Sequence, residues 1–257
     1  MARSPEPNAA RPAADPSADE ALHVALVMDG NGRWAKRRGL PRSLGHRAGV
    51  EALKRTVAAA PELNIRCLTV FGFSTENWSR PAAEVAELMA LPRRYFESDL
   101  GRLEREGVRV RVIGRREGLN ADLIQIIEEA ERRTAGNDQF FLQVAFNYGG
   151  QADITEGARR FAQDVSAGLL RPEDLDEARF AAYLSTSATP PPDLIVRPSG
   201  EQRLSNFLLW EAAYSELIFQ DVLWPDYGPE HLKAAIDAFR TRERRYGAVA
   251  DDALATG

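Results

Sequence analysis

Cysteine is nearly absent from the sequence: Cys67 is the only one in 257 residues. A lone thiol excludes an intramolecular disulfide and a zinc site built from several cysteines, and it is compatible with a reducing compartment. Long apolar runs are missing as well, since none approaches the roughly 20 residues that a membrane-spanning helix needs. No apolar segment follows Arg3, so the N-terminus does not resemble an export signal.

An excess of basic charge is also missing. The chain carries 33 Lys and Arg residues against 38 Asp and Glu residues, which gives a net charge of −5 at pH 7. This balance argues against a dedicated nucleic-acid binder. The composition is otherwise that of an ordinary globular protein, with 44% hydrophobic and 28% charged residues.

The two ends of the chain differ in composition from the rest. Residues 1–20 contain four prolines, six alanines and no aromatic residue, so we expect a disordered N-terminal tail. Residues 248–257 are expected to form a C-terminal tail. Between them no linker or repeat is visible, and residues 21–247 are predicted to form one domain.

Short apolar runs alternate with segments of helical periodicity along this domain. The apolar runs predict six strands, at residues 23–29, 66–73, 108–114, 139–146, 193–197 and 216–221. The periodic segments predict helices, at about residues 46–60, 83–106, 120–134, 152–167, 174–184 and 231–246. Because strands that are apolar on both faces and separated by helices are typical of parallel sheets, we predict an α/β fold. Its sheet would be six-stranded, mostly parallel and covered by helices on both sides.

The predicted helix at 83–106 carries a long apolar stripe that includes Leu88, Phe96 and Leu103. Periodicity alone favours simple packing of this stripe on the sheet. The alternative is that the helix forms one wall of an apolar tunnel. Pro92 is expected to kink or break the helix.

Three loops rich in hydrogen-bond donors each follow a predicted strand: residues 28–34 (MDGNGRW), 73–81 (FSTENWSRP) and 197–207 (RPSGEQRLSNF). Ligands of open α/β sheets bind beyond the carboxyl ends of the strands, where these loops would meet. Glycines and arginines suit phosphate groups, and Asp29 beside them suggests a carboxylate that holds Mg²⁺. A plain turn, a helix cap and an exposed ion-pair loop are the respective alternatives. Together, the loops and the apolar helix predict a site for two polyphosphate groups with an apolar chain leading away.

Three further residues have open interpretations. His46 has no cysteine or histidine at metal-ligand spacing and is more typical of a hydrogen-bonding residue at a helix start. Arg42 either extends the cationic pocket or is solvated. Glu216 opens an apolar strand and is either a surface acid or a second metal carboxylate.

At these loops the sequence resembles the cis-prenyltransferase family, and within it the bacterial undecaprenyl diphosphate synthases. The resemblance covers about residues 22–247. It rests on four segments in order, namely HVALVMDGNGRWAKRRGLPRSLGHRAG, FGFSTENWSRPAAEV, NYGG at 147–150 and RPSGEQRLSNFLLWEAAYSELIFQDVLWPD. It implies an α/β fold with an apolar tunnel.

The resemblance also implies roles for individual residues. Asp29 would be the essential Mg²⁺ ligand, Glu216 a second metal carboxylate, and Asn77 an aid to proton removal. The residues implied to bind the allylic starter or line its site are Gly30, Asn31, Gly32, Arg33, Trp34, Arg42, His46, Ser74, Thr75, Glu76, Trp78 and Arg80. Those implied to bind isopentenyl diphosphate are Arg197, Arg203, Leu204 and Ser205.

The implied activity is a Mg²⁺-dependent condensation of isopentenyl diphosphate onto an allylic diphosphate, farnesyl diphosphate by expectation, with cis double bonds. The expected product is undecaprenyl diphosphate, the carrier lipid of cell-wall synthesis. The resemblance implies a homodimer with residues 200–216 in the subunit contact. It also implies a cytoplasmic enzyme, with transient contact to the inner membrane because the product is a lipid.

Several alternatives stay open. Pro198 and Gln202 depart from the family pattern, where Thr and His are common, and Phe140 and Phe146 are bulkier than their counterparts in some long-chain members. The phenylalanines favour a short- or medium-chain cis-prenyl diphosphate synthase as the alternative product class. A non-catalytic partner subunit is disfavoured because such subunits lose the catalytic aspartate, and Asp29 is present. A trans-type synthase is disfavoured because no aspartate-rich DDxxD segment occurs, and a generic phosphate-binding module would not explain the apolar stripe.

Overall fold

A computed structural model describes residues 21–242, and the expected tails at 1–20 and 248–257 lie outside the described residues. The described chain contains one sheet with the strand order β3-β4-β2-β1-β5-β6. Every neighbouring pair in it is parallel, so the sheet is all-parallel rather than mostly parallel. The strands are β1 (Leu22–Val27), β2 (Ile65–Ser74), β3 (Val108–Ile113), β4 (Phe140–Tyr148), β5 (Leu194–Arg197) and β6 (Glu216–Phe219).

Helices connect the strands in nearly the predicted places. They are α1 (Asn31–Arg37), α2 (Arg42–Ala59), α3 (Ala82–Arg105), α4 (Ala121–Arg133), α5 (Gly150–Ser166), α6 (Glu177–Ala181) and α7 (Pro229–Arg240). Short 3₁₀ helices are η1 (Pro61–Leu63), η2 (Thr75–Ser79), η3 (Pro172–Asp174), η4 (Glu211–Tyr214) and η5 (Trp224–Asp226). The short helix α1 was not predicted, and α7 ends at Arg240 rather than at residue 246.

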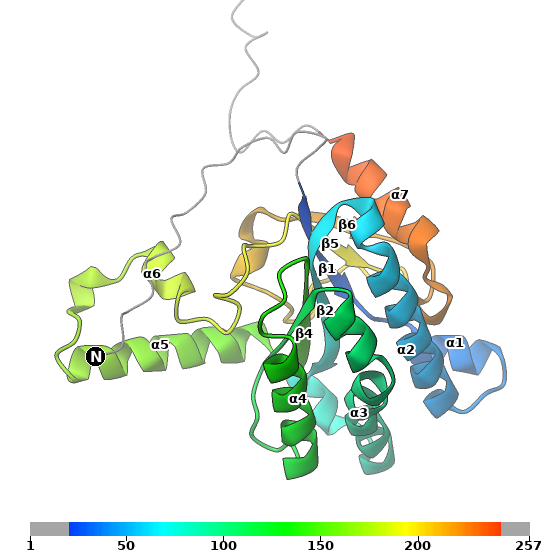
Figure 1. Ribbon diagram of the computed structural model, residues 1–257, viewed down its shortest axis with the longest axis horizontal. Coiled ribbons are helices and arrows are strands. Elements are labelled where there is room, and N and C mark those ends of the chain that lie inside the picture. Colours follow the sequence, from blue (N-terminus) through cyan, green and yellow to red (C-terminus); the bar gives the residue numbers. More distant parts are fainter. Residues whose placement is uncertain (1–20, 243–257) are drawn as a thin grey trace, which may run out of the picture.

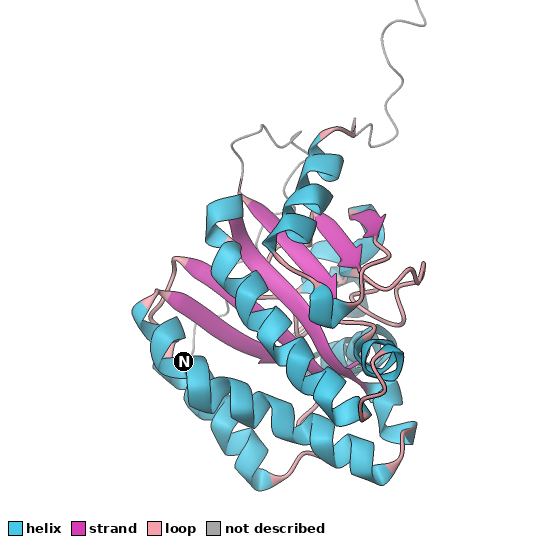
Figure 2. Cartoon of the chain, turned by 90° about the vertical axis from the view of Figure 1, so that its right-hand side faces the viewer, coloured by secondary structure: helices cyan, strands magenta, loops and turns pink. Residues whose placement is uncertain are grey.

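The two faces of the sheet are covered differently (Figures 1 and 2). Helices α2, α3, α4 and α7 pack on one face and form the main core with alternate strand residues such as Val24 and Leu26. On the other face a smaller core includes Val27 and Phe71, and it is closed by Phe207 and Leu208 from the segment before η4. Helix α5 reaches sideways from the sheet with α6 beyond it (Figure 1). The expectation that helices cover both faces is therefore wrong for this second face.

Helix α3 runs without interruption through Pro92. The predicted break is therefore absent. Apolar side chains of the stripe, among them Leu88, Phe96 and Leu103, are buried in the main core, as the simple packing interpretation predicts. The tunnel stays a prediction. Within residues 21–242, none of the helices combines the length and the apolar character needed to cross a bilayer.

Candidate active site

The carboxyl ends of parallel strands lie at one edge of the sheet, and the loops that follow β1 and β5 meet there. Asp29 lies two residues beyond the end of β1, and Arg197 is the last residue of the neighbouring strand β5. Gly30 has a φ of 105°, which side chains rarely adopt, and a Cβ there would lie 3.0 Å from Leu223. This glycine lets the chain turn immediately after Asp29.

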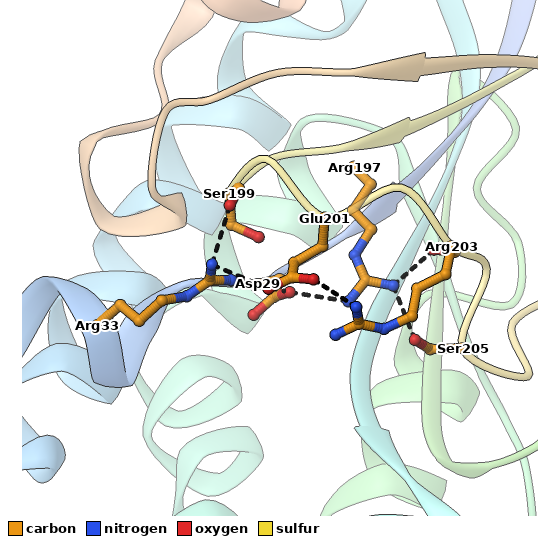
Figure 3. A network of polar contacts seen from close by, with 7 residues as sticks. All are labelled: Asp29, Arg33, Arg197, Ser199, Glu201, Arg203 and Ser205. Carbon is orange, nitrogen blue, oxygen red and sulfur yellow. Dashed lines mark hydrogen bonds and ion pairs between the residues drawn. The ribbon is translucent and has the colours of Figure 1, made fainter.

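Arg197 holds the centre of the site (Figure 3). Its Nη2 donates to Asp29 Oδ2 at 2.8 Å. Its Nη1 donates to the carbonyl oxygen of Arg203 at 2.5 Å and to Ser205 Oγ at 2.8 Å. The Arg197 side chain is only 6% exposed. A buried guanidinium with bonds to three partners is a rigid element, which suits recognition of an anion.

The pKa of Asp29 lies below its ordinary value. Burial alone would raise this pKa, but the hydrogen bond from Arg197 and the charges of Arg197 and Arg33 outweigh burial. The Asp29 side chain is still 28% exposed. Asp29 is therefore a charged carboxylate that remains open to a cation from solvent.

Glu201 ties two further arginines to this centre (Figure 3). Arg33 Nη1 donates to Glu201 Oε1 at 3.1 Å and to the carbonyl oxygen of Ser199 at 3.0 Å. Arg203 pairs with the other oxygen of Glu201. The exposed ion-pair interpretation of this loop is therefore correct for Glu201, while Arg197 from the same loop is buried.

The loop after β5 has an unusual backbone. Ser199, Ser205, Asn206 and Leu208 all have positive φ, with values of 89°, 53°, 63° and 46°. Non-glycine residues adopt this region rarely, and such residues gather at binding and catalytic sites because the surrounding contacts must enforce them. The hydrogen bond from Arg197 to Ser205 and the buried side chains of Phe207 and Leu208 supply such contacts.

A second cationic group lies between α2 and the start of α3. Arg80 Nη1 donates to Glu84 Oε1 at 2.8 Å, Arg42 Nη1 lies 3.3 Å from Glu84 Oε2, and His46 Nε2 lies 3.5 Å from Glu84 Oε1. Glu84 is only 8% exposed. Burial lowers the pKa of His46, against the opposing charge of Glu84. Three side chains predicted for the starter's diphosphate thus share one carboxylate.

The two groups adjoin each other at the helix pair α1 and α2. A Cβ on Gly32 would lie 2.9 Å from Arg42 Nε, so the Arg42 guanidinium rests against the residue before Arg33. A Cβ on Gly45 would lie 2.2 Å from the carbonyl oxygen of Asn31, so the glycine permits α2 to pass close to α1. The Oδ1 atom of Asn31 is buried without a hydrogen-bond partner in the described structure. One continuous region is therefore lined by Arg33, Arg42, Arg80, Arg197 and Arg203.

The loop after β2 lies at the same edge of the sheet. Asn77 Oδ1 accepts from the backbone N of Ser74 at 3.1 Å, so the capping interpretation of Asn77 is correct. Glu76 Oε1 accepts from Asn206 Nδ2 at 2.7 Å, which connects this loop to the loop after β5. Thr75 faces the same junction, since a Cβ on Gly149 would lie 2.5 Å from its Oγ1.

Two tryptophans and a leucine complete the predicted set. Trp78 is 40% exposed and its Nε1 donates to Asn147 Oδ1 at 2.8 Å. Trp34 Nε1 instead donates to Asp226 Oδ1 at 2.7 Å, beneath the guanidinium of Arg38. Leu204 packs on the smaller core.

Known proteins resemble this chain in sequence and in fold. A family model described as putative undecaprenyl diphosphate synthase matches residues 27–247. The isoprenyl transferase of Caulobacter vibrioides is 65% identical over 243 residues, which cover 95% of this chain and 94% of that protein. The isoprenyl transferase of Bacillus subtilis is 48% identical over 227 residues, which cover 88% and 87%.

The chain belongs to the isoprenyl transferase family of cis-prenyltransferases.

Solved structures agree with this assignment. Lavandulyl diphosphate synthase from Lavandula x intermedia, in complex with dimethylallyl diphosphate, matches with a TM-score of 0.86 and 38% identity over 88% of this chain and 98% of that one. A probable undecaprenyl diphosphate synthase from Campylobacter jejuni matches with a TM-score of 0.73 and 32% identity over 89% and 99%. The predicted α/β fold and isoprenyl transferase activity are thereby confirmed.

Glu216 is the predicted site residue that the structure does not bring to this isoprenyl transferase site. It is the first residue of β6 and pairs with Leu194, the first residue of β5, so it lies at the amino edge of the sheet. Asp29 lies beyond the carboxyl edge, and the two carboxylates do not meet within one chain. Arg242 Nη1 donates to Glu216 Oε2 at 2.6 Å. The surface-acid interpretation therefore describes Glu216 in the single chain.

Sequence reasoning missed two residues of the site. Glu84 had a usable signal, because it follows Arg80 by four residues at the start of a predicted helix, where an acidic residue and an arginine pair readily. Asn147 begins the NYGG segment that the resemblance singled out, but its contact with Trp78, 69 residues away, had no local signal. Within residues 21–242, no group of three or more His, Cys, Asp and Glu side chains could hold a metal ion.

Proposed function

We propose that this isoprenyl transferase extends farnesyl diphosphate with isopentenyl diphosphate to undecaprenyl diphosphate, the carrier lipid of cell-wall synthesis. The observation that carries the proposal is that Arg33, which follows β1, and Arg197, the last residue of β5, both contact the carboxylate of Asp29, with Arg203 of the loop after β5 beside them. Two diphosphates repel each other strongly in one site unless several guanidinium groups and a cation offset their charge.

The two cationic groups are assigned to the two substrates. Arg197, Arg203 and Ser205 would bind the diphosphate of isopentenyl diphosphate, because Arg197 is fixed and Arg203 is exposed beside it. Arg42 and Arg80, with His46 and Arg33, would bind the diphosphate of the allylic starter. Within residues 21–242, Arg80 and Arg42 each use one nitrogen on Glu84, which leaves other N–H groups for phosphate oxygens.

Asp29 fits a magnesium ion that is held by one protein carboxylate. Mg²⁺ prefers oxygen ligands, keeps several waters, and is commonly bound by one or two carboxylates together with substrate phosphates. Both guanidinium contacts of Asp29 use the same oxygen, Oδ2, and its lowered pKa keeps the group charged. Asp29 would therefore hold Mg²⁺, which supplies positive charge to the departing diphosphate.

The side chains around Asp29 favour the reaction through their fixed positions. As the allylic C–O bond breaks, negative charge grows on the departing diphosphate, and donors that are already in place stabilise it without reorganising. Asn77 is the candidate aid to proton removal. Because its Oδ1 already accepts from Ser74, its NH₂ group would contact substrate as a donor, orienting a diphosphate oxygen that takes the proton.

We also propose a homodimer with residues 200–216 in the subunit contact. In support, Tyr214 of this segment is 79% exposed in the single chain, and exposed aromatic side chains are enriched where subunits meet. A cytoplasmic enzyme that touches the inner membrane transiently fits a lipid product, and no nucleic-acid partner is expected. The homodimer, the cytoplasmic location and the membrane contact are properties that membership of the family suggests for this chain.

A short-chain product is the second candidate. Phe140 and Phe146 are both 3% exposed inside the sheet, and Phe146 packs on Phe73 with ring centroids 5.4 Å apart. These two large side chains lie in the main core together with residues of α3, where they would shorten a tunnel on that face of the sheet. The likeness to a lavandulyl diphosphate synthase points the same way.

The test is to incubate the pure protein with farnesyl and isopentenyl diphosphates and Mg²⁺, and then to size the dephosphorylated product by chromatography. A product of eleven isoprene units supports the proposal. A single product of two to four units replaces it with the short-chain alternative.

A further inference from the structure

Asn147 occupies a buried corner behind the predicted substrate site. It is the penultimate residue of β4, it is 3% exposed, and its φ is 52°. Its Nδ2 donates to the carbonyl oxygens of Arg115 and Glu117, at 3.0 and 2.9 Å. Its Oδ1 accepts from Trp78 Nε1 at 2.8 Å. A left-handed conformation and three side-chain hydrogen bonds on one asparagine indicate a specific task for this residue.

Only an asparagine-like amide suits these partners. The indole N–H of Trp78 can only donate, and the two carbonyl oxygens can only accept, so the amide oxygen and the NH₂ group each have a fixed direction. Both N–H bonds of the amide are used. The backbone oxygen of Asn147 also accepts from the backbone N of Arg115 at 3.0 Å. Asn147 therefore joins the loop between β3 and α4 to the loop after β2.

Trp78 is held in place by these contacts while part of it stays exposed. Its ring meets Phe73 edge-on, with centroids 5.4 Å apart, and a Cβ on Gly118 would lie 3.5 Å from it. The side chain is 40% exposed. The hydrogen bond to Asn147 fixes the rotation of the indole about its own axis, which packing on one edge of Phe73 alone does not fix.

We propose that Asn147 is a positioning residue that holds Trp78 as a rigid wall against the isoprenoid chain of the allylic substrate. The inference rests on the proposed function, in which Trp78 lines that site. A ring that is already oriented loses no rotational freedom when an apolar chain packs on it, so the benefit appears as tighter binding of the allylic substrate. Isopentenyl diphosphate, assigned to Arg197 and Arg203, gains nothing from Asn147.

Asn137 offers a matched control. Its Nδ2 also donates to two backbone carbonyl oxygens, those of Glu104 and Val108, at 3.1 and 2.9 Å. It lies just before β4, at the opposite edge of the sheet from Trp78. Asn137→Ala and Asn147→Ala therefore remove similar bonds, but only Asn147→Ala frees the indole.

The experiment measures steady-state kinetics and tryptophan fluorescence for wild type, Asn137→Ala, Asn147→Ala, Asn147→Asp and Trp78→Phe. In Asn147→Ala the KM for the allylic diphosphate should rise about ten-fold, the worth of one buried hydrogen bond, and the KM for isopentenyl diphosphate should not change. The emission of Trp78, obtained by difference from Trp78→Phe, should shift in Asn147→Ala and not in Asn137→Ala. Asn147→Asp keeps the oxygen that accepts from the indole, so its allylic KM should stay within about two-fold of wild type even though stability falls.

A double-mutant cycle decides whether Asn147 acts through Trp78. In a Trp78→Phe background, Asn147→Ala should raise the allylic KM no further. Three results would overturn the inference. The first is equal kinetics for Asn137→Ala and Asn147→Ala, and the second is wild-type kinetics for Trp78→Phe. The third is an allylic KM for Asn147→Asp as high as that for Asn147→Ala. If Asn147→Ala does not fold, the inference is overturned by wild-type kinetics for Trp78→Phe or by an allylic KM for Asn147→Asp more than about two-fold above that of wild type. A wild-type protein that makes no prenyl product would instead contradict the proposed function.

Discussion

Replacing Arg197 with methionine removes the guanidinium that holds Asp29, Ser205 and the carbonyl oxygen of Arg203 together. The Arg197 side chain is 6% exposed, so these groups lose a buried partner that water replaces poorly. Removing one member of a fully buried ion pair costs about 3–5 kcal/mol. Because Asp29 is 28% exposed and keeps its contact with Arg33, we expect a loss of about 2 kcal/mol at neutral pH.

The loss should depend on pH with a definite sign. In the wild type the pKa of Asp29 lies below its ordinary value of 3.8, so Asp29 contributes stability above that pH and loses it as the pH falls. Arg197→Met loses the lowering effect of Arg197 but keeps the burial of Asp29, so the pKa of Asp29 should rise relative to the wild type and protonation at low pH should cost the variant less. The difference between the two proteins should therefore shrink from about pH 7 to about pH 4.

Urea unfolding at these two pH values measures the difference. Arg133→Met is the control, because it breaks an exposed ion pair with Glu104 and should leave the unfolding midpoint close to that of wild type. A loss for Arg197→Met that is no larger than the control's, or one that grows as the pH falls, would refute the reasoning.

Three further predictions concern the surroundings of the site. Glu84→Gln should raise the KM for the allylic diphosphate in steady-state assays more than the KM for isopentenyl diphosphate, because Arg80 loses its charged anchor; equal changes in both would contradict this. Gly45→Ala should lower the urea midpoint by the equivalent of about 1–3 kcal/mol, because its Cβ would meet the backbone oxygen of Asn31, and a neutral effect would show that α1 yields freely. Burial raises the pKa of Glu211, whose Oε2 has no hydrogen-bond partner within the described residues, so its charged form costs stability as the pH rises. Glu211→Gln should therefore stabilise the protein in urea unfolding at about pH 8 and change little at about pH 4, and the reverse order would reject the argument.

Much of the fold could be predicted from the sequence because it follows from local patterns. Apolar runs and periodic segments placed the strands and most helices within a few residues. Because Asp29 and Arg197 each stand at the carboxyl end of a predicted parallel strand, the sequence alone places them at one edge of the sheet. Helix α1 was missed because residues 31–37 show no apolar periodicity, and its close approach to α2 at Gly45 is a tertiary contact.

The sequence predicts the part of the site whose residues lie in loops directly after strands, because the direction of a strand fixes the edge at which its loop lies. Glu216 opens its strand, and the first residue of a parallel strand lies at the edge opposite to Asp29, so strand direction alone argued against a shared ion. The coverage of the second face by the Phe207 segment, and the burial of Glu84 among Arg42, His46 and Arg80, depend on tertiary packing. No local pattern contains that information.

The central claim is that Asp29 is the charged anchor around which two diphosphates are brought together. Asp29→Asn keeps the size of the side chain and its ability to accept a hydrogen bond from Arg197, but it removes the charge. The direct measurement is the incorporation of labelled isopentenyl diphosphate by this variant, with circular dichroism to verify the fold. The account predicts that incorporation is abolished while the fold is intact, and near-normal turnover by a folded Asp29→Asn protein would contradict it.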